Sequence, residues 1–189
     1  MGDTSEVIRQ IEKSITVKKG LEPEAIVTIA KVLVNAFRSG KKVLLFGNGG
    51  SAADAQHIAC ELAGKFYIDR SSLPAIALTT NTSSLTSIAN DYGYDMVFQR
   101  QIQGLVQKSD VIIGISTGGS SQNVVAAIQE GKRRGAITVA FIGQGGKLND
   151  IADYVISVPS RDTPRIQEAH ITAGHIICYL VEKELFGDG

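Results

Sequence analysis

Short apolar runs, separated by stretches long enough to form helices, recur along this sequence and constrain its fold more than any other feature. Such runs are typical of strands that are buried on both faces of a sheet. Because most of the intervening segments have helix length, the pattern predicts an α/β fold: a doubly wound, five-stranded parallel sheet with helices on both faces and right-handed crossovers. The runs occupy residues 43–46, 75–78, 111–115, 137–142 and 154–158.

Amphipathic stretches precede the first predicted strand and follow the last. Residues 5–19 and 22–38 place apolar side chains at helical intervals, and Gly40 follows where a helix C-terminus favours a left-handed residue. Residues 165–186 also have a helical pattern, but polar side chains interrupt their apolar stripe. A helix buried only in a core would not need these polar groups, so the interruption indicates a site.

Composition excludes several classes of partner. The 19 basic and 19 acidic side chains cancel, which argues against nucleic acid and against an anionic membrane surface. No apolar run approaches the roughly 20 residues of a membrane-spanning helix. The N-terminus lacks the pattern of a signal peptide, so we expect a cytoplasmic protein.

The chain shows neither an internal repeat nor a linker. We therefore expect one domain over residues 1–189, with a helical segment at 1–39 and an α/β core at 40–189 that includes the C-terminal helix. The two cysteines, Cys60 and Cys178, lack the spacing of a metal site, and we expect both to be buried free thiols.

A glycine turn at residues 47–54 leaves the first predicted strand and enters a helix. Glycines let the backbone approach a ligand closely, and the free amides at the start of a helix favour an anion. A phosphate or a sugar hydroxyl fits such a turn. The spacing also resembles the dinucleotide fingerprint, but that motif needs an acidic residue after the next strand, where the chain has Thr79 and Thr80. A tight turn without any ligand is the alternative.

A second turn, at residues 116–123, follows the third predicted strand and reads Ser-Thr-Gly-Gly-Ser-Ser-Gln-Asn. Its clustered hydroxyls can donate several hydrogen bonds to phosphate oxygens without a lysine. Capping of a helix explains one hydroxyl at such a place, but four in six residues exceed what a cap requires. The turn is therefore interpreted as a neutral cradle for an anion.

Two pairs of polar residues lie at helical spacing. His57 and Glu61 project from one face of the helix that begins at the first glycine turn, and Gln167 and His175 share a stripe of the final helix. Imidazole nitrogens with carboxylate or amide oxygens suit a borderline cation such as Zn²⁺. A solvated helix face is the better explanation of either pair taken alone.

Taken together, these segments resemble the sugar isomerase (SIS) domain family, and within it the phosphoheptose isomerases. The resemblance runs from the first helix to the last, through residues 47–57, 89–93, 114–117 and 165–170. It implies a flavodoxin-like fold and conversion of sedoheptulose 7-phosphate to D-glycero-D-manno-heptose 7-phosphate, for nucleotide-activated heptose and surface polysaccharide. It further implies a homotetramer that uses the N-terminal helices for assembly and has its sites between subunits.

The resemblance also assigns roles to residues. One Zn²⁺ per subunit would bind His57, Glu61, Gln167 and His175, the two pairs that the helical spacing had singled out. Gln167 would contact the substrate as well. The remaining binding residues would be Asn48, Gly49 and Ser51 at the first turn, Asp91 near the sugar hydroxyls, and Ser116, Thr117 and Ser121 at the phosphate. The family often has a serine where this chain has Gly118, so one phosphate contact would be lost or provided by Ser120.

Isomerisation through an enediol needs a base at carbon and an acid at the oxygens. We expect Glu61 to take the carbon-bound proton and His175 to act as its acid–base partner, while zinc polarises the carbonyl. A non-catalytic member of the fold, a binding module that associates with the replication initiator, is the main alternative. It shares the Arg-Ile-Gln-Glu-x-His motif but does not keep all four metal residues. A sugar-phosphate sensor or an amino-sugar isomerase would usually need a second domain, for which the chain has no room.

Overall fold

The structure is a computed structural model that describes residues 3–187. Its centre is a five-stranded, all-parallel sheet with the strand order β2-β1-β3-β4-β5. This is the flavodoxin-like order of a doubly wound fold, so the predicted fold class is confirmed. The strands are β1 (Val43–Gly47), β2 (Ala75–Ala77), β3 (Val111–Ser116), β4 (Ile137–Ile142) and β5 (Tyr154–Ser157).

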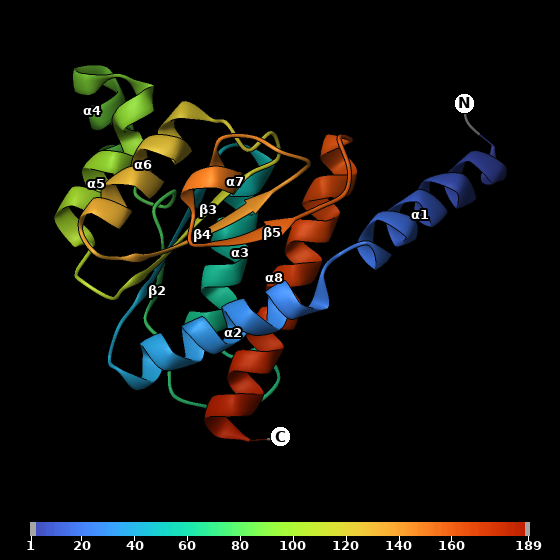
Figure 1. Cartoon of the computed structure of the whole chain (residues 1–189), viewed down its shortest axis with the longest axis horizontal. Coiled ribbons are helices and arrows are strands. Elements are labelled where there is room, and N and C mark those ends of the chain that lie inside the picture. The colour runs from blue at the N-terminus through green and yellow to red at the C-terminus, as the bar shows by residue number, and fades with distance from the viewer. Residues whose placement is uncertain (1–2, 188–189) are drawn as a thin grey trace.

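Helices cover both faces of the sheet (Figure 1). Side chains along β1 alternate between two cores: Val43 and Leu45 pack into one, and Leu44 and Phe46 into the other. The first core is closed by α2 (Pro23–Arg38), α3 (Gly50–Ala63) and α8 (Thr163–Phe186). The second core is closed by α4 (Thr82–Tyr92), α5 (Val97–Leu105), α6 (Gln122–Arg133) and α7 (Leu148–Ile151), and the 3₁₀ turn η1 (Tyr94–Met96) joins α4 to α5.

The two edge strands are less buried than the sequence predicted. β1 and β3 are buried along their whole length, but Ile76 in β2 is 41% exposed and Ser157 in β5 is also exposed. Burial of all five strands on both faces was therefore a wrong expectation for β2 and β5. The helices cover the centre of the sheet more completely than its edges, so an edge strand keeps contact with solvent.

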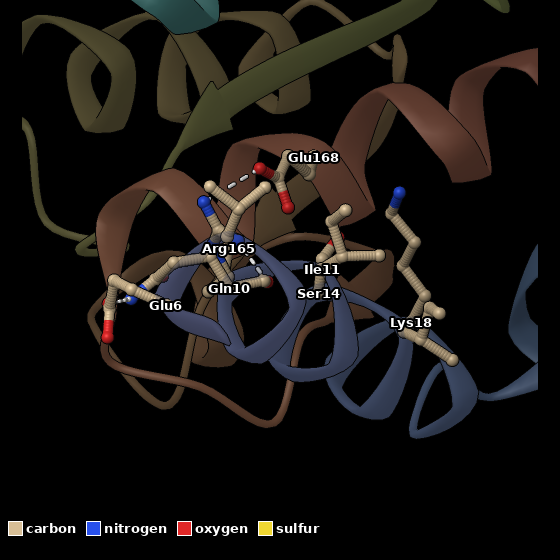
Figure 2. Close-up of a pocket in the computed structure, with 9 residues that line it drawn as sticks. Glu6, Gln10, Ile11, Ser14, Lys18, Arg165 and Glu168 are labelled. Atoms are coloured by element: carbon tan, nitrogen blue, oxygen red, sulfur yellow. Dashed lines mark hydrogen bonds and ion pairs between the residues drawn. The ribbon is translucent and has the colours of Figure 1, made fainter. Parts of the chain in front are cut away.

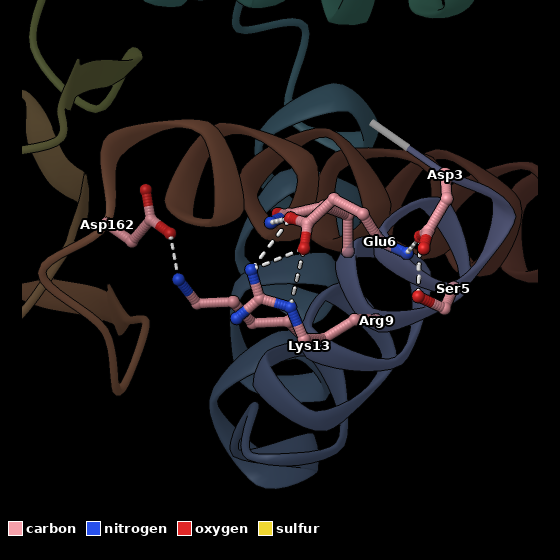
Figure 3. A network of polar contacts seen from close by, with 7 residues as sticks. Asp3, Ser5, Glu6, Arg9, Lys13 and Asp162 are labelled. Carbon is pink, nitrogen blue, oxygen red and sulfur yellow. Dashed lines mark hydrogen bonds and ion pairs between the residues drawn. The ribbon is translucent and has the colours of Figure 1, made fainter. Parts of the chain in front are cut away.

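Helix α1 (Thr4–Lys19) extends away from the sheet (Figure 1) and contacts the first turns of α8. Lys13 forms an ion pair with Asp162, at 2.6 Å, in the segment that leads into α8 (Figure 3). Arg165 of α8 donates to the backbone oxygen of Gln10 at 2.8 Å. The predicted apolar stripe of this helix remains open in the single chain, because its side chains are between 46% and 57% exposed: Val7, Ile8, Ile11 and Ile15.

The cysteines are both free, but only one is buried. Burial raises the pKa of the Cys178 thiol to about 12. Cys60 is exposed on α3, so the expectation that it is buried was wrong. Gly40 has φ +67° just after α2, as predicted. Within residues 3–187, no helix has the length and the apolar character needed to cross a membrane.

Candidate functional site

The carboxyl ends of β1 and β3 carry the two predicted turns side by side. These strands are neighbours in the sheet, and the chain winds outward from them in opposite directions. In open α/β sheets this switch point is where ligands bind, because the loops on either side diverge and leave a crevice. Both turns therefore lie at the switch point of the sheet, where proteins of this fold class usually bind ligands.

The first turn is closely packed at two of its glycines, against backbone at Gly47 and against a flexible side chain at Gly50. A Cβ on Gly47 would lie 2.8 Å from the backbone oxygen of Ile115 in β3, and a Cβ on Gly50 would overlap the side-chain amide of Gln167 from α8. Gly49 has φ +56°, which favours glycine. Ser51 is buried in the first turn of α3. These glycines let β3 and α8 approach the start of α3.

The second turn holds its hydroxyls together. Ser116 and Ser121 lie with their oxygens 2.9 Å apart, and the Ser121 side chain makes no capping hydrogen bond to α6 although it occupies the N-cap position. Thr117 beside them is partly buried. Ser120 is directed elsewhere, since its hydroxyl accepts a hydrogen bond from the backbone N–H of Lys147 at 3.1 Å. Three of the predicted phosphate-binding residues thus form one cluster at the start of α6.

An amide pair that the sequence did not predict connects the two turns. Asn48 and Asn123 exchange reciprocal side-chain hydrogen bonds of 2.9 Å, and Tyr94 donates to Asn48 at 3.2 Å. Asn123 is buried and also accepts from the backbone of Val124. The only signal in the sequence was the position of Asn123 at the end of the hydroxyl cluster. Through these hydrogen bonds, Asn123 fixes the position of Asn48 relative to the second turn.

His57, Glu61 and His175 converge on one point between α3 and α8. The His57 Nε2 atom lies 3.1 Å from Glu61 Oε1 and 3.3 Å from His175 Nε2, and the two imidazole rings meet edge to face. One ligand atom from each residue fits within a span of 4.8 Å. Two imidazoles and a carboxylate so close together form a donor set that suits zinc. We call these three residues the His/Glu/His cluster.

The cluster forms because α3 and α8 run parallel and in close contact. Gly174 faces Ile58, and a Cβ on Gly174 would lie 2.6 Å from that side chain, so Ile58 would have to shift to accommodate a larger residue. The ring of Phe66 covers His175 with centroids 5.7 Å apart. The sequence gave no role to Phe66, whose aromatic character was the only available signal.

Gln167 and Asp91 lie outside this cluster. Gln167 is eight residues before His175, roughly 12 Å along the helix axis, and its amide rests against Gly50. Asp91 is exposed near the end of α4 and accepts a hydrogen bond from Asn90. The structure therefore brings together three of the four predicted metal ligands. The role of Gln167 as the fourth ligand, and of Asp91 at the sugar hydroxyls, stays a prediction.

Two further titratable groups lie on the helices of the site. Asp54 is one turn before His57, and burial raises its pKa to about 6, an effect that the nearby His57 partly opposes. Its Oδ2 atom is buried without a hydrogen-bond partner among the described residues. His170 is fully buried in α8 against the Ile142 backbone oxygen, and burial lowers its pKa to about 4, so it is a neutral part of the core.

Strand order, the two paired turns and the His/Glu/His cluster define an α/β protein with a candidate metal site on α3 and α8. Residues 6–143 match the SIS domain family. A phosphoheptose isomerase from Sulfurimonas denitrificans is 52% identical over 186 residues, which cover 95% of each chain. The chain belongs to the phosphoheptose isomerase family of SIS-domain proteins.

Solved structures agree with this membership. A phosphoheptose isomerase from Francisella tularensis superposes with a TM-score of 0.91 at 33% identity, over 97% of this chain and 100% of the other. One from Neisseria gonorrhoeae gives a TM-score of 0.89 at 38% identity, over 95% and 98% of the two chains. The similarity therefore extends over the whole fold and is not confined to the turns.

Proposed function

We propose that this chain is an aldose–ketose isomerase that converts sedoheptulose 7-phosphate to D-glycero-D-manno-heptose 7-phosphate. The observation that carries the proposal is the convergence of His57, Glu61 and His175 on the same pair of helices that holds the first glycine turn. The proposed acid–base groups thus lie on α3 and α8, the two helices that also meet at the first glycine turn. The relatives named above are isomerases, and nothing in them favours the binding-module alternative.

The substrate phosphate is proposed to bind at the second turn. Ser116, Thr117 and Ser121 offer hydroxyl donors there. The backbone amides at the start of α6 carry the partial positive charge of a helix N-terminus, which favours an anion. The sugar then extends toward Asn48 and Ser51 at the first turn. Binding the phosphate at the far end orients the carbon chain and contributes proximity rather than chemistry.

Glu61 is the proposed base, and His175 is its proposed acid–base partner. Glu61 removes the proton from the carbon next to the carbonyl, which gives an enediol, and returns a proton to the neighbouring carbon. His175 moves the proton between the two oxygens. The Glu61 side chain is 20% exposed and touches His57, so it is held in place yet remains open to a ligand.

The donor set of the His/Glu/His cluster fits a zinc ion. His57, Glu61 and His175 would hold it, and Gln167 would have to turn from Gly50 to become a fourth ligand. When bound, zinc polarises the substrate carbonyl and stabilises negative charge on its oxygen. Proton transfer itself remains the task of the side chains.

Assembly as a homotetramer in the cytoplasm completes the proposal. The half-exposed apolar stripe of α1 lies beside a groove of about 670 Å³ between α1 and α8 (Figure 2). An exposed apolar surface of this kind marks an interface. We expect Ile11→Asp to lower the molar mass measured by light scattering, whereas Leu105→Asp, at an exposed apolar position on α5, leaves it unchanged.

Turnover of sedoheptulose 7-phosphate, measured before chelation, after chelation and after zinc is restored, tests the activity and the metal together. Glu61→Gln should abolish turnover and leave phosphate binding intact, while Glu24→Gln, an exposed site on α2, serves as the matched control. Substantial activity in Glu61→Gln would contradict the base assignment. No turnover with zinc bound would point to another sugar phosphate, and no turnover without zinc binding would favour the binding module.

A further inference from the structure

A buried ion pair lies next to the His/Glu/His cluster, and the proposed chemistry does not use it. Arg70 in the segment after α3 and Glu182 near the end of α8 meet at 3.0 Å, with side chains only 2% and 4% exposed. Removing two charges from water is costly, so such a pair persists only where hydrogen bonds satisfy both partners. Both partners are satisfied here, and their hydrogen bonds lead to the site.

Glu182 fixes the segment that follows α3. Its carboxylate accepts from the backbone N–H groups of Phe66, Tyr67 and Ile68, at 3.1, 2.7 and 3.1 Å. Burial alone would raise the pKa of Glu182, but these hydrogen bonds and that of Arg70 outweigh it and lower the pKa. The group is therefore an ionised anchor for three consecutive amides.

Arg70 fixes the end of α3 itself. Its guanidinium donates to the backbone oxygens of Glu61 and Leu62, both at 2.8 Å, and of Gly64 at 2.9 Å. Carbonyls in the last turn of a helix have no partner within the helix, and a cation there also complements the helix dipole. Arg70 thus holds the backbone of the proposed base.

The ion pair connects every element that forms the cluster. Glu182 lies two turns beyond His175 on the same face of α8, while Arg70 binds the backbone of Glu61 on α3. Phe66, whose N–H donates to Glu182, places its ring against His175. We infer that Arg70 and Glu182 are positioning residues, which set the separation of Glu61 and His175 and orient the His175 ring. This inference rests on the proposed isomerase function.

Glu182→Gln tests the inference, because the amide has nearly the same shape as the carboxylate but carries no charge. Its NH₂ group would also face the backbone N–H groups or the guanidinium that donate to Glu182. Loss of outer contacts around a metal site typically costs 10–100-fold in metal affinity or activity. We expect kcat and zinc affinity each to fall about 10–100-fold, while KM stays within about twofold because the phosphate turn is untouched. Zinc affinity is measured by competition with a chelator.

Asp110→Asn is the matched control for lost stability. Asp110 is 1% exposed, pairs with Lys42 at 2.6 Å and accepts from the backbone of Gln107. It lies just before β3, at the start of the central strand, and its partners Lys42 and Gln107 belong to neither α3 nor α8. The two variants lose the same kind of buried charge pair. Only Glu182→Gln is expected to lower kcat when both are assayed at a temperature where circular dichroism shows them folded.

A readout without metal or substrate separates this inference from the proposed function. The chain has three histidines, so the carbon-bound ring protons of His175 can be followed by NMR in the metal-free protein. Release of Phe66 from His175 should remove the ring-current shift in Glu182→Gln and leave it in Asp110→Asn. Wild-type protein without turnover would contradict the proposed function, and the NMR comparison would still decide the positioning role.

Arg70→Lys provides a second variant if Glu182→Gln does not fold. It keeps the positive charge but cannot reproduce the fork that reaches Glu61, Leu62 and Gly64 together. We expect the same pattern of lower kcat and weaker zinc binding at a smaller loss of stability. The inference is overturned if the folded variants keep kcat, zinc affinity and the His175 resonance of the Asp110→Asn control.

Discussion

Two adjacent glycines in the second turn should respond in opposite ways to the same substitution. A Cβ added to Gly118 would meet no heavy atom of the described residues within 4 Å, and its φ is not positive. Gly119 has φ +64°, and a Cβ there would overlap the backbone oxygen of Gly145. Serine should therefore be accommodated at position 118 and rejected at position 119.

Gly118→Ser is expected to strengthen phosphate binding, because it adds a hydroxyl beside Thr117 and near the paired Ser116 and Ser121. A hydrogen bond to a charged group contributes about 1.5–3 kcal/mol, and ordering the new side chain costs roughly 0.5–1.5 kcal/mol. The net gain of about 1 kcal/mol corresponds to an approximately fivefold lower KM.

Gly119→Ser is expected to damage the cradle. A left-handed backbone costs a residue with a side chain about 1–2 kcal/mol, and a backbone oxygen cannot rotate out of the way. The turn would have to separate from its neighbour, which breaks the 2.9 Å hydrogen bond from Leu148 N–H to the Gly119 oxygen. These losses together amount to at least about 2 kcal/mol, so KM should rise more than tenfold.

Steady-state kinetics with sedoheptulose 7-phosphate, and competition by inorganic phosphate, measure both variants. The kcat of Gly118→Ser should remain within about twofold of wild type, because the reacting carbons lie at the other end of the substrate. A Gly118→Ser protein that binds phosphate more weakly would refute the reasoning. So would a Gly119→Ser protein that binds it as wild type does.

Three further changes have defined outcomes. Burial raises the pKa of Asp54 to about 6 from 3.8 in the unfolded chain, so ionisation of this side chain opposes folding, in full above pH 6. Asp54→Asn should therefore raise the free energy of unfolding by about 1–2 kcal/mol at pH 7.5, and thermal melts should show that gain shrinking as the pH falls from 6 toward 4. An aromatic disulfide reagent should titrate one thiol per chain in the folded protein and two after denaturation, because Cys60 is exposed while Cys178 is buried with a raised pKa. Two reactive thiols in the folded state would contradict this prediction. Asn123→Ala should remove both hydrogen bonds that Asn123 exchanges with the partly buried Asn48 and leave only the one from Tyr94, so KM should rise about tenfold with little change in kcat. An unchanged KM would show that the amide pair does not order the first turn.

Local pattern was sufficient for the secondary structure and for the two turns, because each is determined by residues close together in sequence. The helix predicted at residues 22–38 is observed at Pro23–Arg38, and the one predicted at 165–186 is observed at Thr163–Phe186. The hydroxyl cluster after β3 is likewise held together by a contact between residues five apart, Ser116 and Ser121. Strand exposure at the sheet edges could not be predicted in this way, since it depends on which strands lack a neighbour.

Contacts between residues far apart in the sequence could not be predicted from residue spacing. Asn48 and Asn123 are 75 residues apart, and Arg70 and Glu182 are 112 apart. Each side chain is ordinary in its local context, because a polar residue on a helix or loop usually faces solvent. Only the folded arrangement shows that these four are partners.

The His/Glu/His cluster lies between these two cases. The four-residue spacing of His57 and Glu61 predicts their contact directly, but His175 joins them across 118 residues because α3 and α8 run parallel. Helical periodicity specifies the face on which a side chain lies and not the level at which a neighbouring helix meets it. The position of α8 along α3 is instead marked by two glycines. Gly50 leaves space for the Gln167 side chain and Gly174 leaves space for Ile58, and in this alignment His175 lies beside His57. Gln167 and His175 share a stripe, yet they meet α3 two turns apart, so a shared face alone could not predict a shared ion.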